Sequence, residues 1–142
     1  MEVSATTRFR GEPAAVPAAR AVVGQALRSA GVTGDEREQL VLAVAEACNN
    51  AILHAGGETF TVAVAVNETR CTITISDGGQ GFYPPRRALM PSPDAVGHRG
   101  LALMQELVDH VTVSSSPAGT TVVLVQELTS DRDRSPPLVV EL

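Results

Sequence analysis

The chain has 142 residues, of which 44% are hydrophobic and only 3% aromatic, and its formal net charge is −5 at pH 7. This length fits one domain with a substantial core, which must be built from Val, Leu, Ile and Ala. All 11 basic residues are arginines, and this excludes a P-loop and a Schiff-base mechanism, because both require a lysine.

The distribution of charge and hydropathy argues against nucleic acid and membrane as partners. No basic cluster is larger than Arg86-Arg87, whereas a nucleic-acid site needs a basic patch. The N-terminus lacks an apolar signal region, and no apolar run has the length of a membrane span. We therefore expect a cytoplasmic protein that contacts neither.

The first part of the chain predicts one strand followed by two helices. Residues 3–10 alternate loosely and are rich in β-branched side chains, as in an edge strand. Apolar residues recur at helical spacing over 14–30. A longer helix begins near Asp35, with acidic residues in its first turn, and ends at about Ala55.

The remainder predicts two hairpins separated by one helix. The ranges are 59–66 and 71–76 for the first hairpin, 101–108 for the helix, and 111–115 and 121–128 for the second hairpin. Helices that do not alternate singly with strands indicate an α+β fold. We expect a two-layer sandwich with the helices on one face of a mostly antiparallel mixed sheet.

Two segments have no period. Residues 82–97 contain four prolines, and the segment is too long for a turn, so we expect a mobile lid. Residues 129–142 combine charge and proline without periodicity, which predicts a disordered tail behind a domain formed by residues 1–128.

The long helix has an unusual polar arc. At about 100° per residue, Glu46, Asn50 and His54 share one narrow arc, whose neighbours are small or apolar. Such sparse polarity indicates the wall of a cleft, although asparagines on a solvent-facing helix surface are an equally simple interpretation of this helix alone. Cys48 falls on the opposite, apolar side and Cys71 begins a strand, which predicts two buried thiols and no disulfide.

Two glycine-rich motifs follow the first hairpin. Asp77-Gly78-Gly79-Gln80-Gly81 is not a dinucleotide fingerprint, because its glycines do not open a helix. It places an acid at the end of a buried strand, before glycines that let a ligand approach the backbone; a capped turn is the alternative. Gly97-His98-Arg99-Gly100 directly precedes a predicted helix, where free N–H groups favour an anion such as a phosphate chain; a hinge is the alternative.

Together these motifs resemble, in order and spacing, the N, G1, G2 and G3 boxes of the GHKL ATPase superfamily. The boxes are Glu46-x-x-x-Asn50-Ala51-x-x-His54, Asp77-x-Gly79-x-Gly81, Gly97-x-x-Gly100-Leu101 and Gly119-Thr120. In its short length and in the form of its first box, the chain is most similar to the stand-alone anti-sigma factor serine kinases. The resemblance covers about residues 3–128 and implies the Bergerat ATP-binding fold.

The resemblance implies ATP and Mg2+ as cofactors, with defined roles for the polar residues. Asn50 would coordinate the Mg2+ that bridges the ATP phosphates. Glu46 would orient or deprotonate the attacking serine hydroxyl. Asp77 would accept a hydrogen bond from the adenine amino group, and Thr120 would complete that contact.

The glycine boxes complete the site that the resemblance implies. Gly79 and Gly81 would give the base room, while the third box would hold the phosphates beneath the lid. The residues of that third box are Gly97, Arg99, Gly100 and Leu101.

The resemblance also implies partners. It predicts a protein-serine kinase that inhibits a sigma factor and phosphorylates a STAS-domain anti-sigma factor antagonist. Members of this family are often homodimers, but the sequence leaves the oligomeric state open. One alternative is a non-catalytic ATP-binding module that sequesters a regulatory partner. Another is the detached ATP-binding domain of a histidine kinase, against which the form of the first box argues.

Overall fold

The computed structural model describes residues 2–55, 58–78 and 96–128 of the chain. The predicted tail lies outside these ranges, as does the predicted lid except for its last two residues. Both therefore remain predictions. None of the helices in the described ranges is long and apolar enough to cross a membrane.

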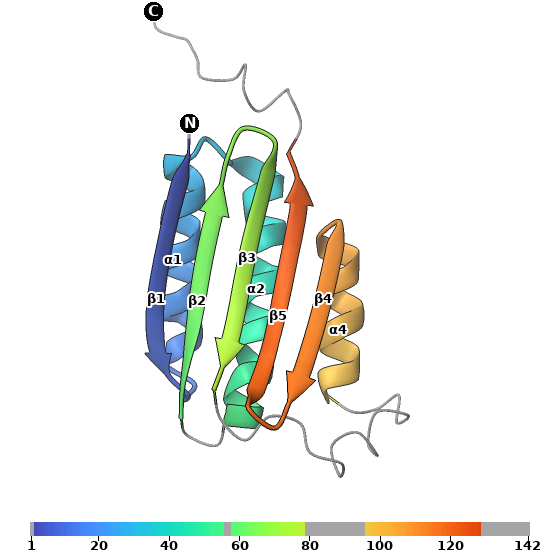
Figure 1. The fold of residues 1–142 in the computed structure, drawn as a ribbon. Helices are drawn as coiled ribbons and strands as arrows, with labels where there is room; N and C mark the ends of the chain where they lie inside the picture. Colours follow the sequence, from blue (N-terminus) through green and yellow to red (C-terminus); the bar gives the residue numbers. More distant parts are fainter. Residues whose placement is uncertain (1, 56–57, 79–95, 129–142) are drawn as a thin grey trace, which may run out of the picture.

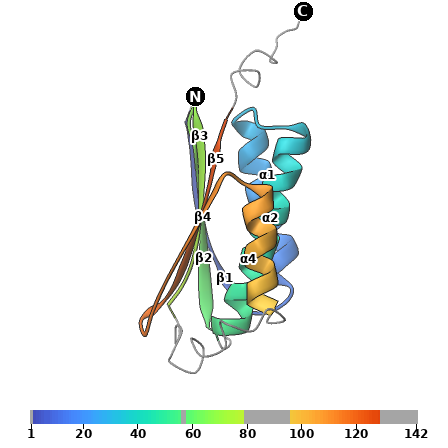
Figure 2. The same cartoon turned by 90° about the vertical axis from the view of Figure 1, so that its right-hand side faces the viewer.

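The described residues form two layers, a five-stranded sheet and the helices that cover one of its faces (Figures 1 and 2). The strand order is β1-β2-β3-β5-β4, and each of the four neighbouring pairs is antiparallel. This arrangement confirms the predicted α+β sandwich. The elements are β1 (Val3–Arg10), α1 (Ala15–Ser29), α2 (Gly34–Ala55), β2 (Thr59–Val66), β3 (Arg70–Asp77), α4 (Val96–Leu107), β4 (His110–Ser116) and β5 (Gly119–Glu127).

The core lies between the sheet and the helices. Alternate residues of β2 and β3 are buried, because a period of two sends every second side chain to the same face. Burying one Val, Leu or Ile contributes about 1.5–3 kcal/mol, so the aliphatic rows compensate for the scarcity of aromatic residues. The largest fully buried side chains include Phe60, Leu27, Leu40, Ile73, Ile75, Met104 and Leu124.

Both cysteines contribute to this core. Cys48 on α2 and Cys71 on β3 are buried thiols and not partners in a disulfide, as predicted. Burial raises the pKa of the Cys48 thiol to about 12, because the apolar surroundings disfavour a thiolate. Cys48 therefore stays protonated at neutral pH and acts as a small apolar side chain.

Helix α1 is fixed against α2 by a polar contact. The Arg37 Nε donates a hydrogen bond of 3.1 Å to the carbonyl oxygen of Gly24. A Cβ on Gly24 would lie only 2.8 Å from a guanidinium nitrogen of Arg37, so the glycine leaves the space that the arginine occupies. The contact thereby holds α2 in a fixed orientation against α1, and with it the side of α2 that points away from α1.

Helix α4 differs from its prediction. It begins at Val96 and not at Leu101, so Gly97 and Gly100 lie inside the helix. Glycine in a helix costs about 0.5–1 kcal/mol relative to alanine. Gly100 is buried, with side-chain atoms of Glu46 and Asn50 lying 3.2 and 3.3 Å from the position that its Cβ would take. Close packing on α2 accounts for the glycine.

Candidate nucleotide-binding site

Two polar side chains of α2 face the start of α4. Glu46 and Asn50 are separated by one helical turn, or about 6 Å along the axis, and both are partly exposed. The position of a Cβ on Gly100 is 3.2 Å from the Glu46 Oε1 and 3.3 Å from the Asn50 Nδ2. A carboxylate and an amide thus lie together at the junction of the two helices, and they share one side of α2, as the polar arc predicted.

The opposite side of α2 explains why these side chains remain accessible. Val44, Ala47, Cys48 and Ala51 are buried, and the first three are completely inaccessible to solvent. An α-helix that buries this side against a sheet must turn the remaining arc outward. The apolar residues on the opposite side of α2 therefore determine that Glu46 points outward.

A second polar pair lies in the sheet. Asp77, the last residue of β3, is the register partner of Thr120 in β5. Each is 6% exposed, and they are the buried polar residues of the described part of the chain. Burying a carboxylate is costly unless it is hydrogen-bonded. A buried acceptor beside a buried hydroxyl is suited to a ligand amino group.

The Thr120 hydroxyl has a further contact within the last hairpin. Its Oγ1 lies 3.2 Å from the Oγ of Ser115, in a hydrogen bond for which either atom can be the donor. Ser115 and Thr120 are register partners between β4 and β5. Ser115 therefore limits the orientations that the Thr120 hydroxyl adopts, a role that the sequence motifs did not indicate.

Gly119 sits where the last hairpin meets the end of β3. Its φ is +142°, and a Cβ there would overlap the carbonyl oxygen of Asp77. Glycine is thus required both by the backbone conformation and by the close approach of the chain. This close approach to Asp77 explains why the fourth box has a glycine at position 119.

The elements that carry the four boxes meet at one end of the sheet (Figure 1). The end of α2, the end of β3, the start of α4 and the start of β5 all lie there. Leu101 is partly buried and packs against the core, which anchors α4 beside α2. The predicted residues Gly79 and Gly81 lie outside the described residues, as do the side chains of His54 and Arg99.

The site offers little for a metal ion that is bound by protein alone. No group of three or more His, Cys, Asp or Glu side chains able to hold a metal occurs among the described residues. Mg2+ typically keeps several waters and takes one or two protein oxygens together with substrate phosphates. The single amide oxygen of Asn50 fits that coordination.

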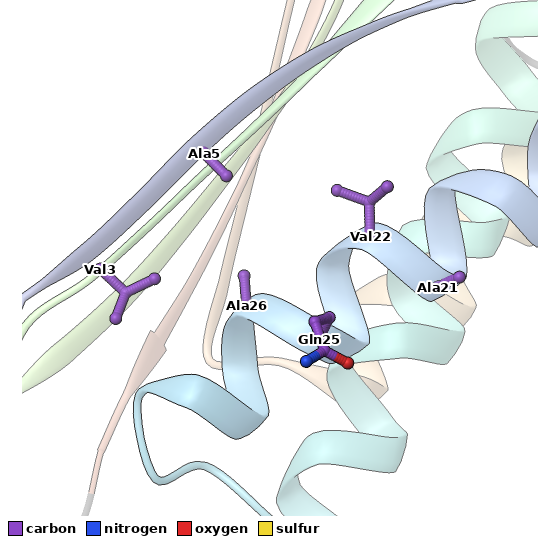
Figure 3. A pocket seen from close by; sticks show the side chains of 6 residues that line it. All are labelled: Val3, Ala5, Ala21, Val22, Gln25 and Ala26. Carbon is purple, nitrogen blue, oxygen red and sulfur yellow. The ribbon is translucent and has the colours of Figure 1, made fainter.

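A separate cavity lies at the edge of the sheet that β1 forms (Figure 3). It has a volume of about 540 Å3 and opens between β1 and α1. Gln25 supplies its only polar side chain; the lining residues are Val3, Ala5, Ala21, Val22, Gln25 and Ala26. With no charged group, this cavity is unsuited to a nucleotide triphosphate.

Known proteins agree with the geometry. The family described as "Histidine kinase-like ATPase domain" matches residues 9–126. The "Serine-protein kinase RsbW" of Bacillus velezensis is 31% identical over 138 residues, which cover 88% of this chain and 86% of the relative. The "Anti-sigma F factor" of Pasteuria penetrans is 30% identical over 112 residues, which cover 71% of this chain and 75% of the relative.

A solved structure shows the same fold. The RsbU and RsbW domains of a Mycobacterium tuberculosis protein superpose with a TM-score of 0.68 at 20% identity, over 87% of this chain and 31% of that one. The family match and the relatives' identities together decide the assignment. The chain belongs to the histidine kinase-like ATPase family, in its branch of RsbW-like serine-protein kinases.

Proposed function

We propose that this protein is an ATP-dependent protein-serine kinase and anti-sigma factor that phosphorylates a STAS-type anti-sigma factor antagonist. The observation that carries the proposal is the placement of Glu46 beside Asn50, against Gly100 at the start of α4. One helix face thus offers a proton acceptor and a metal ligand to the same phosphate chain. The names of the relatives, a serine-protein kinase and an anti-sigma F factor, support this function.

The sheet residues would bind the base. The Asp77 carboxylate would accept a hydrogen bond from the adenine amino group, and the Thr120 hydroxyl would complete the contact directly or through water. Their burial supports this assignment, because a hydrogen bond in a water-excluded site discriminates strongly between bases. Gly79 and Gly81 would leave room for the ring.

The helix residues would bind the phosphates. The Asn50 amide oxygen would hold Mg2+, which neutralises phosphate charge when it is bound. The box at the start of α4 would hold the phosphate oxygens through backbone N–H groups and a charge-assisted contact. Its members are Gly97, Arg99, Gly100 and Leu101.

Glu46 would act in the transfer step. Its carboxylate would take the proton of the substrate serine as the serine Oγ forms a bond to the γ-phosphorus. The bond from that phosphorus to the bridging oxygen breaks, and ADP leaves with the bond's electron pair. Phosphoryl transfer depends mainly on positioning and charge neutralisation, so this small set of residues suffices.

The regulatory setting follows from the same assignment. A sigma factor would be the second partner, inhibited by the kinase in a partner-switching network, so the protein would regulate transcription. A cytoplasmic location follows because the transcription machinery and ATP are found there. We further propose that residues 1–128 form the kinase domain and that the protein acts as a homodimer.

Labelled ATP tests the proposal directly. The purified protein is incubated with γ-labelled ATP, Mg2+ and each STAS-domain protein of the source organism, and label on serine is measured. Wild type should label one of them, whereas Asn50→Ala should lose Mg2+-dependent ATP binding and transfer together. If wild type binds ATP but labels none, the protein is an ATP-binding module that sequesters its partner.

A further inference from the structure

Two exposed leucines lie on the helix that carries Glu46. In the described part of the chain the exposed large apolar side chains are Leu42, Leu53 and Val113, which are 44%, 58% and 42% exposed. Single exposed leucines are common on protein surfaces. Whether Leu42 and Leu53 mark a functional surface therefore depends on the residues that lie between them on α2.

The leucines flank the carboxylate along one face of α2. At about 100° and 1.5 Å per residue, Leu42 lies about 6 Å before Glu46 and Leu53 about 10 Å after it, both within roughly 40° of its direction. Asn49, which is also exposed, falls on the same face. We call Leu42, Glu46, Asn49 and Leu53 the α2 stripe.

The two leucines and Asn49 of the stripe are exposed to solvent. α1 and α4 both pack on α2, and α4 meets both Glu46 and Asn50 through Gly100. The buried side of α2 faces the sheet. In the described structure Leu42, Asn49 and Leu53 are therefore the part of the stripe that these neighbours leave exposed, and α4 borders the stripe at Glu46.

Acidic side chains continue the stripe toward the start of α2. Asp35 and Glu38 are exposed there. Arg37, the arginine of this helix, is turned toward α1 and donates to the Gly24 carbonyl. The surface is therefore apolar around Glu46 and negative beyond Leu42, and it complements a partner that is apolar with a basic flank.

We propose that the α2 stripe is the docking surface for the protein that supplies the serine. This inference rests on the proposed kinase function. When a serine of a folded protein reaches Glu46, the protein surface around that serine contacts α2 for about 10 Å along the helix. Both leucines lie within that distance of Glu46. The fitting partner has apolar side chains beside its serine and a basic side chain directed toward Asp35 and Glu38.

A double substitution tests the surface. Leu42→Ser/Leu53→Ser should raise the KM for the labelled STAS-domain protein at least tenfold, while kcat at saturation and the Kd for ATP stay within about twofold. Val113→Ser is the matched control, since it removes an equally exposed apolar side chain from β4 and should change none of these values. Leu42→Met/Leu53→Met keeps the apolar contact and should retain a KM near that of wild type.

Each other outcome overturns the proposal in a different way. An unchanged KM in the double serine variant excludes the docking surface and leaves the kinase intact; if the sedimentation mass falls as well, a second copy of the chain occupies the stripe. Loss of ATP binding shows that the leucines support the fold. If wild type labels no STAS-domain protein, the kinase function itself fails.

Discussion

The two halves of the candidate site are built differently. Asp77 and Thr120 are buried at 6% exposure and are fixed by the register of β3 and β5. Glu46 and Asn50 are partly exposed and depend on the packing of α4 against α2. The sheet half resembles a core, whereas the helix half resembles a surface that other molecules must reach.

This difference assigns separate tasks to the two halves. In the sheet half, water competes little with a ligand for hydrogen bonds, so the proposed recognition of the base would use a rigid and dry contact. In the proposed function the helix half would have to admit a triphosphate and a protein hydroxyl, which requires access. Substitutions in the sheet should therefore change nucleotide affinity, and substitutions on the helix should change transfer.

The largest effect is expected from Glu46→Ala, which removes the proposed base. Transfer to the antagonist should fall by about two to four decades, the usual contribution of general base catalysis. ATP binding should be kept or tightened, because a negative charge near the triphosphate disappears. Single-turnover transfer and ATP titration measure the two quantities, and a normal transfer rate would show that the carboxylate is not the base.

Gly119→Ala should be the next largest change, since it forces a Cβ onto the Asp77 carbonyl oxygen. Strain at this φ and overlap each cost about 1–3 kcal/mol, so urea denaturation should show a loss of roughly 2–6 kcal/mol in the free energy of unfolding, with weaker ATP binding. Gly31→Ala is the control, because Gly31 has a φ of +86° but nothing within 4 Å of its Cβ position. Equal losses in both variants would mean that strain alone explains the glycine.

Asp77→Asn tests the sheet half alone. Loss of a hydrogen bond to a charged group costs roughly 1.5–3 kcal/mol, so ATP affinity should fall by about one to two decades. GTP affinity should change less, since the new amide can donate to the guanine carbonyl. Parallel ATP and GTP titrations give the ratio, and an unchanged ratio would remove Asp77 from base recognition.

The sequence predicted the strands of the sheet better than the junction between α2 and α4. Strands were recognisable because a period of two marks the buried rows, and β1 has the predicted bounds. The start of α4 was missed by five residues because glycine suggests a loop, whereas packing of Gly100 on α2 overrides its low helix propensity. Tertiary contact decided that boundary.

Periodicity also has limits within the candidate site. It placed Glu46 and Asn50 on one arc, but it does not show which part of that arc a neighbouring helix covers. The exposure of Leu42 and Leu53 becomes evident only in the structure, where α4 meets Glu46 and Asn50 but leaves the leucines uncovered. The Ser115 contact likewise depends on the register of the last hairpin, which residue patterns leave open.

The smallest predicted effect concerns that contact. Ser115→Ala removes the hydroxyl 3.2 Å from the Thr120 Oγ1, and one neutral hydrogen bond contributes about 0.5–1.5 kcal/mol. ATP affinity should therefore fall about two- to tenfold, while transfer at saturating ATP stays unchanged because the helix half is untouched. Ser114→Ala is the matched control, since adjacent residues of a strand face opposite sides of the sheet. An equal decrease in affinity for both variants, measured by ATP titration, would mean that β4 as a whole and not the Ser115 hydroxyl supports the base.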